Sequence, residues 1–359
     1  MKIPVNIPIV GREEIAEVTA VLKKGTLTSA ARDGGPNVQE FERLVCSFVK
    51  SKYAIAVNSG TAALQAALYA LDVKSGDEVV LPSFTFVATA NSVVSVGAKP
   101  VFVDIRRDNY TMDPEDLRKK ITKKTKAIIP VHLYGNVSYI DEISEIARKS
   151  HIPIIEDAAQ SMGSTYRGKQ TGTFSELGCF SLYAAKVMTS GEGGVITTSS
   201  EKLRDKLLMI RNHGMVHGYD TRILGLNLRL PEINAAIAKV QMKKLAGFLR
   251  KRSQNAKILT ELLSGADVTL PIPRKHEKVN WYLYTIASKN RDKISKALNE
   301  NGIGATVYYG MPVHKTPYYN QKAKLPNTEW AAKSVLSLPV QPQITQKHLQ
   351  TTARIIKSL

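Results

Sequence analysis

The chain has 359 residues, of which 43% are hydrophobic and 23% are charged, and 50 Lys and Arg against 31 Asp and Glu give a formal net charge of +19. A single hydrophobic core rarely grows beyond roughly 250–300 residues, so this length predicts two domains. No apolar run approaches the roughly 18 residues that span a bilayer, which argues against a membrane protein. The start of the chain lacks the pattern of a signal peptide, and Cys46 and Cys179 lie in apolar patterns typical of buried thiols, so we expect a cytoplasmic protein.

The excess of positive charge favours anionic partners. Its densest cluster, residues 119–126, ends a helix-like segment, where basic side chains are common because they interact favourably with the helix C-terminus. No nucleic-acid-binding motif accompanies the charge, so we interpret it as solvated surface and expect no nucleic-acid partner. His132, His213 and His217 lack the spacing of metal ligands, so we expect no metal site.

In the first half of the chain, apolar strands alternate with helices. Strands are predicted at residues 53–57, 78–82, 100–104, 127–132 and 152–157, and helices at 39–48, 62–68, from 83, from 113 and at 139–150. This alternation predicts βαβ units and a mostly parallel sheet sandwiched by helices. In such sheets, ligands bind beyond the carboxyl ends of the strands.

The pattern changes in the second half of the chain. Helices are predicted at residues 200–212, 232–263 and 292–300, and strands at 281–286 and 304–308. This indicates a smaller C-terminal α+β domain. We place the boundary inside the long helix, which gives a large domain of residues 1–245 and a small domain of residues 246–359.

The segment Ser59-Gly60-Thr61 stands between an apolar strand and an alanine-rich helix. Free backbone N–H groups at a helix N-terminus, together with hydroxyl groups, form a natural site for an anion such as phosphate. A serine or threonine at this place is also an ordinary helix N-cap, and the segment alone favours that alternative. With a candidate cofactor lysine in the same chain, we interpret Ser59, Gly60 and Thr61 as a phosphate-binding site.

That lysine is Lys186, which follows a short apolar strand and precedes a Gly-Glu-Gly-Gly break within residues 178–194. A lone lysine in a turn is usually an exposed surface residue. An amine with apolar neighbours is, however, what Schiff-base chemistry requires. Our hypothesis is that Lys186 binds pyridoxal 5'-phosphate (PLP) covalently and later transfers a proton.

PLP also requires an anion beside the ring nitrogen, donors for the phosphate and a cover over the ring. Asp157, at the end of a predicted strand, is the candidate anion, although aspartate in such a place commonly caps a helix. Gln160 is a candidate partner for the phenolic oxygen of the ring, and Ser181 a candidate fourth member of the phosphate site. Phe86 is a candidate cover, with a place in the core as the alternative.

Taken together, these segments resemble the DegT/StrS family of PLP-dependent aminotransferases, which act on nucleotide-linked keto sugars. Six motifs in the same order carry the resemblance: Ser59-Gly60-Thr61, Pro82-Ser83-Phe84-Thr85-Phe86, His132-Leu133-Tyr134-Gly135, Glu156-Asp157-Ala158-Ala159-Gln160, Phe180-Ser181 with Lys186 and Gly191-Glu192-Gly193-Gly194, and Asn227-Leu228-Arg229-Leu230. Each motif alone is modest, whereas their order is specific. The resemblance extends from about Pro8 to the C-terminus.

The resemblance implies the aspartate-aminotransferase fold, PLP fold type I, and a homodimer with shared active sites. It implies that Asn227 reaches the phosphate in the partner subunit and that Phe86 stacks on the ring. It also implies a reaction in which an amino acid, usually glutamate, donates the amino group that a nucleotide-diphosphate keto sugar receives.

Two alternatives come from within the same family. Some relatives are sugar dehydratases, in which a histidine replaces the lysine, and Lys186 argues against that activity. Other relatives were first described as regulators, and the pair of Lys186 and Asp157 argues against a non-catalytic protein. The segment Tyr308-Tyr309-Gly310-Met311-Pro312 lacks the frequent His-Tyr-Pro of the family, so the sugar is not assigned.

Overall fold

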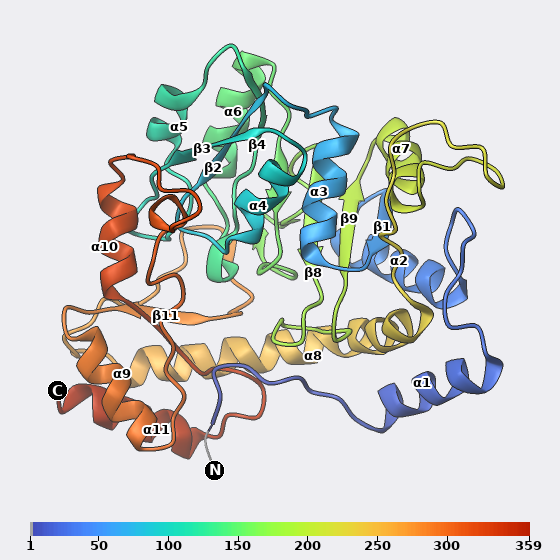
Figure 1. The fold of residues 1–359 in the computed structure, drawn as a ribbon. Helices are drawn as coiled ribbons and strands as arrows, with labels where there is room; N and C mark the ends of the chain where they lie inside the picture. Colours follow the sequence, from blue (N-terminus) through green and yellow to red (C-terminus); the bar gives the residue numbers. More distant parts are fainter. Residues whose placement is uncertain (1–2) are drawn as a thin grey trace.

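The computed structural model describes residues 3–359, and Figure 1 shows its elements in space. Its α-helices are α1 (Arg12–Lys24), α2 (Pro36–Val49), α3 (Gly60–Ala70), α4 (Ala88–Ser95), α5 (Pro114–Lys120), α6 (Ile140–Ser150), α7 (Glu201–Arg211), α8 (Glu232–Leu262), α9 (Arg291–Glu300), α10 (Pro326–Ser334) and α11 (Gln346–Lys357). Its strands are β1 (Tyr53–Val57), β2 (Glu78–Pro82), β3 (Lys99–Val103), β4 (Thr125–Ile128), β5 (Ile155–Asp157), β6 (Thr165–Tyr166), β7 (Lys169–Gln170), β8 (Leu177–Ser181), β9 (Gly194–Thr198), β10 (Glu277–Lys278), β11 (Tyr284–Ala287) and β12 (Val335–Leu338). Two short 3-10 helices span Leu133–Gly135 and Val313–Lys315.

The central sheet has the order β1-β9-β8-β5 on one side and β4-β2-β3 on the other. Parallel bridges from Ile128 to Ile154 and from Val131 to Asp157 join the two halves. The β2–β3, β2–β4 and β5–β8 pairs are parallel, whereas β9 runs antiparallel to both of its neighbours. The prediction of a mostly parallel sheet is therefore confirmed.

Helices cover both faces of this sheet because each strand buries alternate side chains on opposite sides. Ile55 and Val57 of β1 lie in a core with α3, α4 and α7, whereas Ala54 and Ala56 lie in a core with α2 and α8. At the β4-β2-β3 end of the sheet, α5 and α6 pack around Val80 on the face opposite to α3 and α4. The three layers leave the carboxyl ends of the parallel strands open at one edge.

A second core lies in the C-terminal part of the chain, where β11 pairs with β12 and packs with α9, α11 and the end of α8 (Figure 1). Helix α8 contributes residues up to Leu245 to the core beneath the sheet and residues from Ala256 onward to this second core. The domain boundary near residue 245 stays a prediction, and this change of core supports it. None of the helices within residues 3–359 has the length and apolar character that crossing a membrane requires.

Two sequence predictions differ from the structure. The strand expected at residues 304–308 is reduced to isolated bridges, because Gly304 packs against the backbone of Ile3 and Pro4 and Thr306 pairs singly with Ser337. The helix expected from residue 83 begins only at Ala88. The hydroxyl of Ser83 instead bonds the backbone and ring of His314, which holds residues 83–87 as a loop.

Candidate active site

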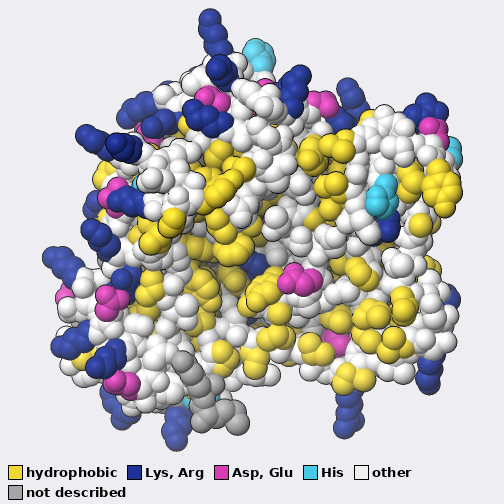
Figure 2. All heavy atoms as spheres, in the orientation of Figure 1, with side chains coloured by type: hydrophobic (Ala, Val, Ile, Leu, Met, Phe, Trp, Pro, Cys, Tyr) yellow, Lys and Arg dark blue, Asp and Glu magenta, His cyan; other side chains and the backbone are white. Residues whose placement is uncertain are grey.

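One cavity of about 620 Å³ opens at the carboxyl edge of the sheet. Eight of the nine predicted site residues line it: Ser59, Gly60, Thr61, Phe86, Asp157, Gln160, Ser181 and Lys186. They come from the starts of α3 and α4, the ends of β5 and β8, and the turn that follows β8. Figure 2 shows hydrophobic side chains gathered around a hollow in the middle of this face, while most Lys and Arg side chains lie toward the rim.

Lys186 lies in the turn between β8 and β9, where its backbone N–H donates to the carbonyl of Tyr183 at 2.9 Å. Its Nζ lies 4.9 Å from the centre of the Tyr282 ring. Removal from bulk water lowers the pKa of Lys186 to about 8, and the carboxylate of Asp157 only partly opposes this shift. Roughly a tenth of this amine is therefore neutral, and thus nucleophilic, at pH 7, far more than for a lysine in water.

Asp157 ends strand β5 and is 5% exposed. Burial raises its pKa above the usual value, while hydrogen bonds from Thr89 and Ala159 and the charge of Lys186 act in the opposite direction. The hydroxyl of Thr89 donates to Oδ2 at 2.8 Å, and the N–H of Ala159 donates to Oδ1 at 3.2 Å. This buried carboxylate is suited to hold a cationic partner inside the cavity, since a nearby positive charge stabilises its ionised form.

Gln160 is fixed by two contacts on its carboxamide. The backbone N–H of Tyr134 donates to Oε1 at 2.8 Å, and Nε2 donates to the hydroxyl of Tyr309 at 2.8 Å. Because a backbone N–H can only donate, the first contact determines which end of the carboxamide is oxygen. One N–H of Gln160 remains for a ligand in the cavity.

The proposed phosphate site is built where α3 approaches β8. Ser59 caps α3 by accepting a hydrogen bond from the N–H of Ala62 at 3.0 Å, which is the alternative role weighed above. The N–H groups of Gly60 and Thr61, in the first turn, have no intrahelical acceptor and are available to an anion. A Cβ on Gly60 would lie 2.8 Å from Cβ of Ser181, so only glycine allows this close approach.

Phe86 borders the cavity and is 58% exposed. Its exposed ring is therefore free to stack on a flat ligand. Asn227 does not line this cavity. Its side chain is exposed, and its carbonyl accepts a hydrogen bond from Nδ2 of Asn58 at 3.1 Å. Its role in a partner subunit stays a prediction.

His132 lies near this edge of the sheet, but its ring is fully buried and turned to Glu156. Its Nδ1 accepts the N–H of Ser138 at 3.0 Å, so Nε2 carries the proton and donates to Oε2 of Glu156 at 2.9 Å. Glu156 also accepts the backbone N–H groups of Gly172, Phe174 and Ser175. Both side chains therefore stabilise the loop before β8.

Among the side chains that line the cavity, sequence reasoning missed Thr89, Tyr183 and Tyr282. Thr89 lies one helical turn beyond the predicted aromatic cover, a spacing that could have suggested a contact with the same ligand. Tyr282 comes from the C-terminal part of the chain and no local pattern marks it, whereas Tyr309 belongs to the segment 308–312 that the resemblance singled out without assigning a role. Glu192, which we interpret as a turn residue, also borders the cavity.

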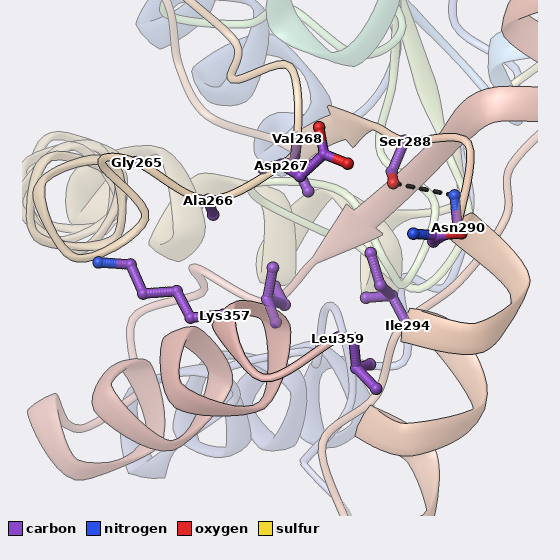
Figure 3. A pocket seen from close by; sticks show the side chains of 10 residues that line it. Gly265, Ala266, Asp267, Val268, Ser288, Asn290, Ile294, Lys357 and Leu359 are labelled. Atoms are coloured by element: carbon purple, nitrogen blue, oxygen red, sulfur yellow. Dashed lines mark hydrogen bonds between the residues drawn. The ribbon is translucent and has the colours of Figure 1, made fainter.

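A second cavity, of about 380 Å³, lies in the C-terminal part of the chain (Figure 3). It is bordered by the 265–268 loop and the end of the chain, and Ser288 accepts the N–H of Asn290 there at 3.0 Å. Asp267 and Lys357 are exposed side chains of its lining. It lacks the paired buried amine and carboxylate of the first cavity, so we assign the chemistry to the first.

The residues of the first cavity fit PLP. They supply an amine of lowered pKa at Lys186, a buried carboxylate at Asp157, a helix N-terminus that glycine leaves open at Gly60, and an exposed aromatic side chain at Phe86. These are the amine, the ring-nitrogen partner, the phosphate donors and the cover that the cofactor requires.

Comparisons with known proteins agree with this arrangement. Residues 8–357 match the DegT/DnrJ/EryC1/StrS aminotransferase family. The chain is 36% identical to the dTDP-3-amino-3,4,6-trideoxy-alpha-D-glucose transaminase of Streptomyces venezuelae, over 86% of this chain and 83% of the relative. It is 38% identical to the UDP-N-acetyl-3-dehydro-alpha-D-glucosamine 3-aminotransferase of Acidithiobacillus ferrooxidans, over 85% and 84%. The crystal structure of S. venezuelae DesV in complex with a ketimine intermediate matches with a TM-score of 0.93 and 32% identity, over 99% and 98% of the two chains.

The expected PLP fold type I is confirmed by this structural likeness, and so is the resemblance that six sequence motifs suggested. Members of the family are PLP-dependent enzymes, which confirms the expected cofactor and class of enzyme. The chain therefore belongs to the DegT/DnrJ/EryC1/StrS aminotransferase family.

Proposed function

We propose that the protein transfers an amino group from an amino acid, with glutamate as the expected donor, to the ketone of a nucleotide-linked sugar. The observation that carries the proposal is the placement of Lys186 and Asp157 in one cavity, with the pKa of the amine lowered to about 8. Two relatives at 36% and 38% identity, named as transaminases of dTDP- and UDP-linked sugars, support this class of substrate.

The bound cofactor supplies an electron-withdrawing ring that makes the proton on the substrate carbon acidic. Asp157 would keep a proton on the ring nitrogen, because a buried carboxylate stabilises a positive charge beside it. With PLP bound, Nζ of Lys186 would take the proton from one carbon and return it to another. Its lowered pKa suits this task, since a base works best when its pKa lies near the working pH.

The proposal includes a homodimer. The cavity face carries a broad set of apolar side chains (Figure 2), and exposed Val10, Ile15, Leu22 and Leu27 follow the N-terminal segment and α1. Apart from Lys186, no cationic side chain lines the cavity within the described residues. Both proposed substrates are anionic, so a partner subunit that supplies further donors, beginning with Asn227, completes the site.

We also propose that the protein works in a reducing compartment such as the cytoplasm. Cys179 is buried, Cys46 is half-buried, and both are free thiols. Burial raises the pKa of both thiols, to about 11 for Cys46, so neither is a reactive thiolate.

A panel assay tests the proposed function. The purified protein, loaded with PLP, is mixed with glutamate or glutamine and with several nucleotide-linked 3-keto and 4-keto sugars, and loss of the donor is followed together with formation of the amino sugar. We expect one donor and one class of sugar to react and Lys186→Ala to be inactive. Loss of sugar hydroxyl without transfer of nitrogen would identify a dehydratase. Absence of turnover with the whole panel would support a non-catalytic protein.

Sedimentation velocity tests the dimer, with the activity measured at the same concentrations. We expect activity to follow the dimer and Asn227→Ala to weaken cofactor binding. Mixed dimers of Asn227→Ala and Lys186→Ala chains should regain one intact site, because both substitutions then fall in the same site and leave the other site with an intact Lys186 and an intact Asn227. A fully active monomer would contradict the shared site.

A further inference from the structure

The backbone at Tyr309 adopts a left-handed conformation, with φ of 65°, which is uncommon for a bulky residue. This conformation directs the ring inward, where it stacks on Tyr134 with centroids 6.1 Å apart and meets Phe84 edge-to-face at 5.8 Å. Strain of this kind persists only where surrounding contacts hold it, and it is concentrated at functional sites. Tyr309 borders the cavity, so the strain places its hydroxyl there.

Only one assignment of donors and acceptors fits the hydrogen bonds around Tyr309. Oε1 of Gln160 accepts from the backbone N–H of Tyr134, so the NH₂ group of Gln160 must face Tyr309 and donate to its oxygen. A phenolic oxygen that accepts this bond keeps its own proton for another acceptor. None of the hydrogen bonds found within residues 3–359 uses that proton. Burial raises the pKa of Tyr309 far above its usual value, so the hydroxyl stays protonated.

We propose that Tyr309 both locks the Gln160 carboxamide and binds the ligand itself, so that the free N–H of Gln160 and the O–H of Tyr309 together bind one oxygen atom of the ligand. The ligand oxygen with the matching chemistry is the ionised phenolic oxygen of PLP, which accepts two hydrogen bonds. A negatively charged oxygen strengthens both bonds. The inference rests on the proposed function only through its cofactor.

A binding experiment tests the proposal without turnover. The apoprotein is titrated with PLP, and the dissociation constant and the absorbance maximum of the bound cofactor are measured for wild type, Tyr309→Phe, Gln160→Leu and the double variant. Tyr110→Phe is the matched control, because Tyr110 lies in the same aromatic cluster but does not border the cavity. Thermal unfolding of each apoprotein checks that the fold is retained.

We expect Tyr309→Phe to weaken PLP binding about tenfold or more, the size expected for one hydrogen bond to a charged oxygen, and to shift the absorbance maximum. The same substitution should add little in the Gln160→Leu background, because the two groups act as a unit. It should also have little effect on binding of the 3-O-methyl ether of PLP, whose oxygen cannot be ionised. Tyr110→Phe should match wild type.

Three results would overturn the inference: wild-type PLP affinity and spectrum in Tyr309→Phe, effects of the two substitutions that simply multiply, or an equal loss with the methyl ether. The outcome is separate from that of the substrate panel. A protein that binds PLP but aminates no nucleotide sugar would refute the proposed function and leave the role of Tyr309 standing. If the protein aminates a sugar and Tyr309→Phe binds PLP as tightly as wild type, the proposed function would stand and the role of Tyr309 would be refuted.

Discussion

Oγ1 of Thr89 lies 2.8 Å from Oδ2 of Asp157, so the first turn of helix α4 holds the carboxylate that ends strand β5. The same oxygen of Thr89 lies 2.9 Å from Oγ1 of Thr85. Because the proton of Thr89 is used on Asp157, Thr85 is the donor of the second bond. Thr85 thus donates to Thr89, Thr89 donates to Asp157, and this chain of hydrogen bonds stabilises the ionised form of the Asp157 carboxyl group.

Replacing Thr89 with valine keeps the shape of the side chain and removes this donor. We expect turnover of the PLP-loaded enzyme to fall about tenfold, because a hydrogen bond to a charged group contributes about 1.5–3 kcal/mol. The hydrogen bond lowers the pKa of Asp157, so its loss raises that pKa and moves the acid limb of the pH–rate profile to higher pH. Ser95→Ala, which removes a local hydroxyl of the same helix, is the control. An unmoved acid limb would argue against this role.

The lowered pKa of Lys186 predicts how the apoprotein reacts with PLP. Only the neutral amine attacks the aldehyde, so the rate should rise with pH up to about 8 and then level off. A lysine with the ordinary pKa of 10.5, such as N-acetyl-lysine amide in solution, should show a rate that still rises above pH 9. Stopped-flow absorbance at a series of pH values measures both. A protein rate that keeps rising to pH 10 would contradict the lowered pKa.

Gly60→Ala should damage both the fold and the phosphate site. The added Cβ would lie 2.8 Å from Cβ and 3.1 Å from Oγ of Ser181, so α3 and β8 must separate. We expect a loss of about 1–3 kcal/mol in the free energy of unfolding, the usual cost of overpacking, and weaker PLP binding. Gly247→Ala is the matched control, because no atom lies within 4 Å of its added Cβ in exposed α8, and it should stabilise by about 0.5–1 kcal/mol. Equal effects of the two substitutions would show that a steric clash with Ser181 is not the reason for glycine at position 60.

Arg252 is a buried cation of α8 that donates to the carbonyls of Trp281 and Tyr282 and to Oδ1 of Asn6. These bonds hold the turn in which Trp281 has a φ of 53° and which places the Tyr282 ring beside Lys186. Arg252→Met removes the donor to the carbonyl of Trp281 and to Oδ1 of Asn6, while the carbonyl of Tyr282 keeps a bond from Nδ2 of Asn6, so we expect a loss of about 1–3 kcal/mol in unfolding free energy.

Weaker PLP binding should accompany that loss, because the Tyr282 ring is no longer held. Arg250→Met on the exposed side of α8 is the control, since exposed substitutions change stability by no more than about 0.5 kcal/mol. Denaturant unfolding and PLP titration measure both effects. Indistinguishable behaviour of the two variants would show that Arg252 does not hold this turn.

Much of the fold could be predicted because it depends on local patterns. The strands at residues 53–57 and 78–82 and the helix after Asp113 have the predicted starts, since apolar runs and capping residues act on their own neighbours. The strand predicted at residues 304–308 was wrong, because that apolar run is taken up by contacts with Ile3 and Ser337. A pattern within five residues contains no information about such distant partners.

The sequence alone was enough to choose Lys186 and Asp157 as the candidate amine and acid. Lys186 and Asp157 follow strands of one parallel sheet, whose carboxyl ends must meet at one edge, so their proximity follows from the order of elements. The tertiary structure decided what surrounds them: Thr89 on Asp157, Tyr282 beside Lys186, and Tyr309 on Gln160. Gln160 and Tyr309 are 149 residues apart, and only the packing of the C-terminal part against the sheet brings them together.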